Sequence, residues 1–131
     1  MALFDYSDVF ANSPMTGIAD TFRFFKKSPN NISCLNRTFK NCKNLQHLPG
    51  EDQPQQDGSP NWSWFFDQCT FVESMEETFA GSSITSFPLM KPLPYLYSAK
   101  GCFKDCTNLK ILGVYSFFNQ REIRRSKLFC I

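Results

Sequence analysis

Long hydrophobic runs are missing from this sequence, and so is a large excess of either charge. No stretch of about 18 consecutive apolar residues, the length needed to cross a bilayer, occurs in the chain. Fourteen Lys and Arg residues against twelve Asp and Glu residues leave a net charge of +2. That balance lies far from the basic excess typical of nucleic-acid-binding proteins. The sequence therefore predicts no membrane span and no nucleic-acid partner.

Motifs for catalysis and metal binding are scarce as well. The sequence has a single histidine, His47, and no C-x-x-C pair, so a zinc site has too few ligands. Neither a G-x-S-x-G nucleophile elbow nor a phosphate-cradling glycine loop is present. We predict no catalytic residue, no metal and no cofactor, and hence a protein that is not an enzyme.

Phenylalanine is the residue that the sequence has in excess, with fifteen among 131 residues. Four of these residues close similar four-residue segments, three of which read Thr-Phe, and they are Phe22, Phe39, Phe79 and Phe103. The residues after Phe39, Lys-Asn-Cys-Lys-Asn-Leu, recur after Phe103 as Lys-Asp-Cys-Thr-Asn-Leu and in a shortened form after Phe79. Self-similarity of this kind, with a unit of about 24 residues, predicts stacked coils in which each Phe packs on its counterpart.

Each coil is expected to hold a short strand and a helical turn. Segments 45–48, 84–87 and 109–112 are too short for helices and are bounded by Pro or Gly, so we predict strands that stack in parallel. The Phe-x-x-Cys stretch is predicted to be a helical turn with a small side chain under close packing. Cys42, Cys69 and Cys106 are therefore interpreted as equivalent coil positions rather than disulfide partners.

At these positions the chain resembles the BspA-like leucine-rich repeats. Units of that family read approximately apolar-x-x-apolar, a short linker, and then Phe-x-x-Cys-x-x-Leu-x-x-Ile. The likeness covers about residues 10–117. It implies an α/β fold, a short leucine-rich-repeat solenoid with stacked parallel strands and helical turns. It also implies a ligand-binding or adhesive scaffold on a cell surface, and similar repeats look at home in phage virion or tail proteins.

The chain is expected to form one domain over residues 1–131. Within it we expect repeats over about 10–117, an inserted polar loop at 50–61 and a C-terminal cap at 118–131. The N-terminus carries neither the basic region nor the apolar run of a secretory signal. The location is therefore left open, with a cell surface or a virion favoured.

Contact residues are predicted from strand alternation and from aromatic residues beside the loop. The outward strand positions are expected to be Gln46, His47, Thr85, Ser86 and Lys110. Trp62 and Trp64 flank the inserted loop, where they would either anchor a partner or pin the loop onto the repeats.

These features together predict a non-enzymatic repeat module that binds a protein or glycan surface. The alternative is a structural component of a phage virion or tail, whose partners would be other subunits of a larger assembly. Exposed apolar ends would favour the assembly subunit, whereas a monodisperse monomer would favour the free binding module.

Overall fold

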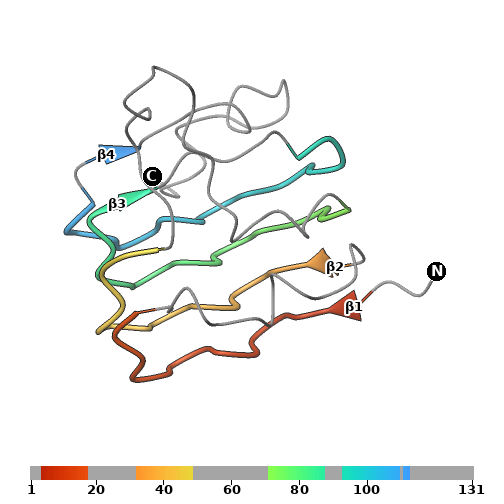
Figure 1. Ribbon diagram of the computed structural model, residues 1–131. Helices are drawn as coiled ribbons and strands as arrows, with labels where there is room; N and C mark the ends of the chain where they lie inside the picture. The colour runs from red at the N-terminus through yellow and green to blue at the C-terminus, as the bar shows by residue number, and fades with distance from the viewer. Residues whose placement is uncertain (1–3, 18–31, 49–70, 88–92, 110, 113–131) are drawn as a thin grey trace, which may run out of the picture.

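The computed structural model describes residues 4–17, 32–48, 71–87, 93–109 and 111–112 of the chain. These residues form four segments that lie side by side, one above the next (Figure 1). We call residues 4–17 the first layer, 32–48 the second, 71–87 the third, and 93–109 with 111–112 the fourth. The predicted loop 50–61 and cap 118–131 lie outside the described residues.

Four very short strands pair in parallel at the two ends of the layers. At one end β1 (Phe4–Asp5) pairs with β2 (Ile32–Cys34), and at the other β3 (Ser86–Phe87) pairs with β4 (Ile111–Leu112). Single parallel bridges continue both pairings across further layers; they join Cys34 with Ser74, Ser74 with Ser98, and Gly17 with His47. β3 and β4 fall inside segments 84–87 and 109–112, for which strands were predicted.

One phenylalanine from each layer contributes to a column of stacked rings. The ring centroids are 5.5 Å apart between Phe10 and Phe39, 5.5 Å between Phe39 and Phe79, and 6.1 Å between Phe79 and Phe103. The rings of Phe39, Phe79 and Phe103 are almost completely buried. Part of the excess of phenylalanine is therefore explained by the core, in which each layer contributes one Phe ring.

The first ring of the column differs from the anchor expected from the sequence. Phe10 stacks on Phe39, whereas the alignment placed Phe22 first, and Phe22 lies outside the described residues. Two residues after the ring, every layer has a left-handed residue, namely Asn12, Asn41, Gly81 and Asp105. Gly, Asn and Asp adopt that conformation most easily. Phe22 has Phe24 at this position, so the Phe10 segment meets the backbone requirement and the Phe22 segment does not.

The two described Phe-x-x-Cys stretches, 39–42 and 103–106, were predicted as helical turns and are successive β-turns instead. In the second layer the N–H groups of Thr38, Lys40 and Cys42 each donate to the carbonyl three residues earlier. Arg37 and Asn41 have φ values of 57° and 59°, which interrupt any helix. Among the described residues the structure contains no α-helix.

The N–H groups that lie between those donors point to the next layer and donate to its carbonyls. Each turn therefore also links two layers by hydrogen bonds. Arg37 donates to the Glu76 carbonyl at 2.9 Å and Phe39 donates to the Thr78 carbonyl at 2.9 Å. The first and third layers donate upward in the same way. Backbone groups at the buried positions are thereby satisfied without a regular helix or a long strand.

The threonine before the ring bonds the layers together as well. Thr38 and Thr78 are fully buried, and their hydroxyl groups donate to the carbonyls of Tyr6 and Leu35 in the preceding layer, at 3.0 and 2.9 Å. A buried hydroxyl is costly unless it finds such an acceptor. Thr-Phe therefore recurs for two reasons: the Phe ring stacks in the core, and the Thr hydroxyl bonds to the preceding layer.

Candidate binding surface

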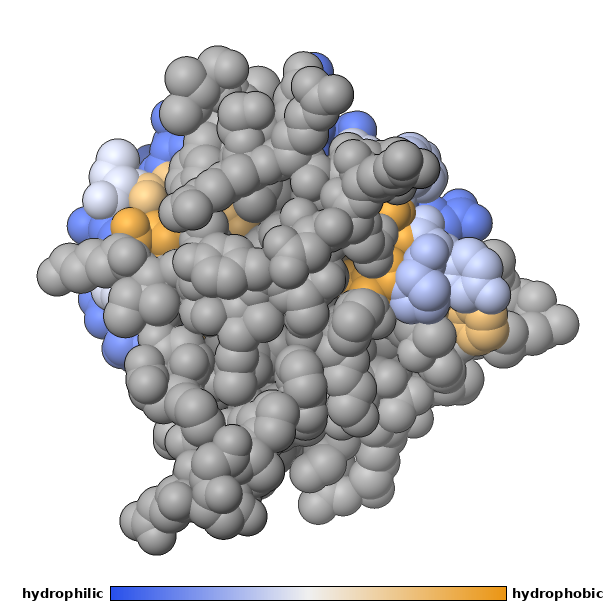
Figure 2. All heavy atoms as spheres, turned by 90° about the horizontal axis from the view of Figure 1, so that it is seen from above, coloured by the Kyte–Doolittle hydropathy of each residue, from blue (hydrophilic) through white to orange (hydrophobic). Residues whose placement is uncertain are grey.

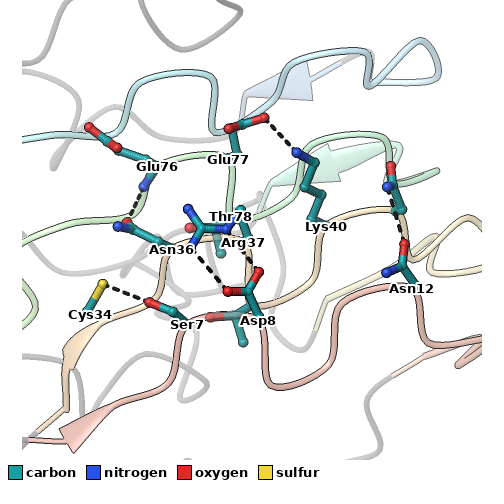
Figure 3. Close-up of polar contacts among 12 residues, drawn as sticks. Ser7, Asp8, Asn12, Cys34, Asn36, Arg37, Lys40, Glu76, Glu77 and Thr78 are labelled. Carbon is teal, nitrogen blue, oxygen red and sulfur yellow. Dashed lines mark hydrogen bonds and ion pairs between the residues drawn. The ribbon is translucent and has the colours of Figure 1, made fainter.

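The turns present a surface of charged side chains that pair between layers (Figure 3). Arg37 donates to both carboxylate oxygens of Asp8, with Nε to Oδ1 at 2.9 Å and Nη2 to Oδ2 at 3.1 Å. Lys40 Nζ lies 3.0 Å from Glu77 Oε1. Both pairs are partly or largely exposed to solvent, so they contribute little to stability. They do set the direction in which these side chains point.

Asparagine side chains connect the layers beside these pairs. Asn36 Oδ1 accepts hydrogen bonds from the Ser74 hydroxyl at 2.7 Å and the Glu76 N–H at 2.8 Å. Asn41 Nδ2 donates to Asn12 Oδ1 at 3.3 Å. The polar side chains of the turn surface are thus largely engaged with one another.

The Asp8 carboxyl is expected to titrate below the ordinary range of an aspartate. The hydrogen bonds from Arg37 hold the pKa of Asp8 down, and the charges of Arg37 and Lys40 act in the same direction. Because the pKa is lowered in the folded state, the stabilising effect of the ion pair is present at neutral pH and is lost as the pH falls through that lowered value. Carbon-detected NMR titration of the full chain would measure the shift.

The matched variants are Arg37→Gln and Lys40→Gln. Arg37→Gln should return the Asp8 pKa to the ordinary range, whereas Lys40→Gln removes a minor influence and should move the pKa much less. An Asp8 pKa that is the same in wild type and Arg37→Gln would contradict the assignment.

The buried cysteines act as packing residues with weak hydrogen bonds. The Cys42 thiol donates to the Phe10 carbonyl at 3.2 Å and the Cys106 thiol donates to the Phe79 carbonyl at 3.1 Å, each in the preceding layer. Burial raises the pKa of Cys42, Cys102 and Cys106. Since the thiolate is the reactive form, these thiols are poor nucleophiles at neutral pH. Cys42, Cys102 and Cys106 carry no disulfide, and neither does the half-buried Cys34.

Iodoacetamide is expected to alkylate these cysteines at rates set by their burial. Cys34 should react first among the four described thiols, because it is the one that is not buried, and Cys102 should react only when the chain unfolds. Peptide-resolved mass spectrometry would follow each site in the folded chain. In urea all four rates should become similar, and early modification of Cys102 in buffer would show that the core opens locally.

The contact residues predicted from the sequence fall partly within the described residues. Gln46 and His47 are exposed and Thr85 is half-buried, and the Thr85 N–H donates to the Gln46 carbonyl at 3.1 Å. These three lie near one another at the β3 end, where Ser86 belongs to β3. Lys110, Trp62 and Trp64 lie outside the described residues.

A depression of about 280 Å³ lies on the turn surface between the third and fourth layers. Two carboxylates and two ammonium groups surround it, and the lining residues are Glu76, Glu77, Lys100, Gly101 and Lys104. Glu77 is paired with Lys40, and Glu76 accepts a hydrogen bond from Ser98 at 2.8 Å. The mixed charge does not select a ligand of either sign.

The β1 and β2 end carries a second exposed surface, which we call the tyrosine face. It comprises Phe4, Ser33, Phe71, Glu73, Tyr95 and Tyr97. Phe4, Tyr95 and Tyr97 are 46, 55 and 62% exposed, and the rings of Phe71 and Tyr95 stack with centroids 5.6 Å apart. Seen from above, apolar and mildly polar side chains lie together at the side of the molecule that carries β1 and β2 (Figure 2).

The tyrosine face was not predicted from the sequence. Leu93 and Leu96 are buried and Tyr95 and Tyr97 are exposed, and this mixture of leucine and tyrosine in segment 93–97 was the available signal. Segment 93–97 has no counterpart among the recurring segments, so the repeat did not single it out.

The described residues offer neither a cluster of metal ligands nor a membrane-spanning helix. No three His, Cys, Asp or Glu side chains in the described part of the chain are grouped so that they could hold a metal ion. Within the same residues, no helix has the length and apolar character needed to cross a membrane.

Comparison of the chain with protein-family models, with curated proteins and with solved structures finds no match. The function is therefore inferred from the residues themselves.

Proposed function

We propose that the chain is a non-enzymatic recognition module, a short solenoid of the leucine-rich-repeat type that binds a protein or glycan partner. The observation that carries the proposal is the tyrosine face, where large aromatic side chains are exposed on backbone that is bonded from layer to layer. Tyrosine offers a large contact area at low conformational cost and is enriched where proteins bind partners. A rigid support lowers the ordering cost of binding further.

A binding screen with two double variants tests this proposal. The full chain is immobilised and exposed to arrays of peptides of differing charge and of defined glycans. Tyr95→Ser with Tyr97→Ser should abolish binding of the ligands found, whereas Gln46→Ala with His47→Ala should leave it unchanged. Urea denaturation of both variants checks that they fold. Absence of any ligand on both arrays, or equal binding by the tyrosine variant, would overturn the proposal for this face.

A second candidate is a subunit of a larger assembly, such as a virion or tail. The first layer favours it, because Val9 is 48% exposed at the position where Thr38 and Thr78 are buried in the next two layers. A surface of this kind is suited to contact with another subunit. Sedimentation velocity distinguishes the candidates, since self-association that Val9→Thr weakens supports the subunit and a monomer at all concentrations rejects it. Recovery of the native protein in a stoichiometric particle would be the direct demonstration.

A further inference from the structure

The tyrosine face places one side chain from each layer in a continuous row. Its members are Phe4, Ser33, Glu73 and Tyr97, and adjacent layers are bonded at these residues. Glu73 N–H donates to the Ser33 carbonyl at 2.8 Å, and Tyr97 N–H donates to the Glu73 carbonyl at 2.9 Å. Paired backbone of this kind is spaced by about 4.8 Å. The exposed Glu73 and Tyr97 side chains, which lie in adjacent layers, are therefore neighbours.

Buried side chains anchor this row from below. Val72 is fully buried next to Glu73, and Leu96 is 3% exposed next to Tyr97. The rings of Phe71 and Tyr95 flank the row and stack on each other. The exposed groups therefore project from a fixed backbone rather than from a free loop.

The charge of the tyrosine face has one sign. Segments 4–5, 32–34, 71–74 and 95–98 contain the carboxylates of Asp5 and Glu73, and they contain no Lys, Arg or His. Among the described residues, Glu73 has no ion-pair partner, whereas Asp8, Arg37 and Lys40 of the turn surface are paired. The chain as a whole carries a net charge of +2, so an acidic, aromatic face is a local departure from its average.

We propose that the tyrosine face binds a cationic segment of a partner protein, with a Lys or Arg side chain seated between the Tyr97 ring and the Glu73 carboxylate. This inference rests on the proposed recognition function and names the partner class. Tyrosine rings attract ammonium and guanidinium groups through the charge distribution of the ring, and a carboxylate in the neighbouring layer adds a charge-assisted hydrogen bond. A neutral glycan gains no ionic contact from Glu73, and an acidic partner is repelled by it.

The test uses the full chain and a fluorescent nonapeptide of alternating arginine and glycine, followed by fluorescence anisotropy. Glu73→Gln and Tyr97→Leu are each expected to weaken binding about fivefold, the change that corresponds to a cation–π contact or an ionic hydrogen bond at an exposed site. The matched control is Asp105→Asn, which removes the same charge from an exposed residue of the turn surface and keeps a side chain suited to its φ of 59°. This control should bind the peptide as the wild type does.

Two results would overturn the inference. Equal weakening by Glu73→Gln and Asp105→Asn would mean that the peptide responds only to net charge. Array ligands that are glycans or neutral or acidic peptides, and whose binding is lost in the tyrosine double variant but kept in Glu73→Gln, would reject the cationic partner. That second result would leave the recognition function itself intact.

Discussion

Phe79→Ala is expected to cost the chain a large part of its stability. Phe79 is fully buried and stacks on a ring from each neighbouring layer, Phe39 on one side and Phe103 on the other. Truncating such a residue costs about 3–5 kcal/mol, because burial is lost and a cavity remains. A domain is typically stable by about 5–15 kcal/mol in total. Urea denaturation followed by circular dichroism should therefore show a midpoint at a much lower urea concentration than in the wild type.

Two further variants make this result specific to the ring column. Phe79→Leu keeps most of the apolar volume and should fold with a smaller loss. Phe4→Ala removes the same side chain from a position that is 46% exposed and should shift the urea midpoint only slightly. If Phe79→Ala and Phe4→Ala unfolded at the same urea concentration, the stacked rings would not be the main support of the layers.

The parts of the fold that were accessible to sequence reasoning are those in which identical residues recur. Phe39, Phe79 and Phe103 were recognisable as equivalent because the residues that surround them also recur, down to the buried Cys42 and Cys106. A side chain that stacks on a copy of itself is constrained in every layer, so the constraint appears directly as a repeat.

The turn conformation was predicted wrongly because its signal lies in backbone requirements rather than in apolar spacing. Left-handed residues occur two positions before and two positions after each ring, and the later position is Asn, Asn, Gly or Asp. That set points to β-turns and against a helix. Applied to the sequence, the same criterion selects Phe10 over Phe22 as the first ring.

The candidate site escaped sequence reasoning for a different reason. Surface residues are not constrained by stacking, so equivalent positions hold unlike residues, as Ser33, Glu73 and Tyr97 illustrate. Only the pairing of the layers shows that residues so far apart in the chain are neighbours. The tyrosine face lies at the opposite end of the layers from Gln46 and His47.

Gly81→Val is expected to produce the second large loss of stability, about 2–3 kcal/mol. Gly81 has a φ of 71°, a conformation that a β-branched residue adopts only with strain. A side chain there would also meet Asn41 Oδ1 of the preceding layer at less than contact distance. Asn41 would have to move, which would disturb its hydrogen bond to Asn12. Thermal and urea denaturation would measure the change.

The control for the glycine prediction is Gly17→Val, because a side chain at Gly17 meets no atom within 4 Å and its φ lies outside the left-handed region. That variant should unfold close to the wild type. Adding Asn41→Ala to Gly81→Val separates the two causes, since it removes the steric conflict and leaves the backbone strain. The double variant should therefore be less destabilised than the sum of the two single variants. Strict additivity would assign the whole loss to the backbone, and an equal loss in both glycine variants would show that the left-handed position imposes no special requirement.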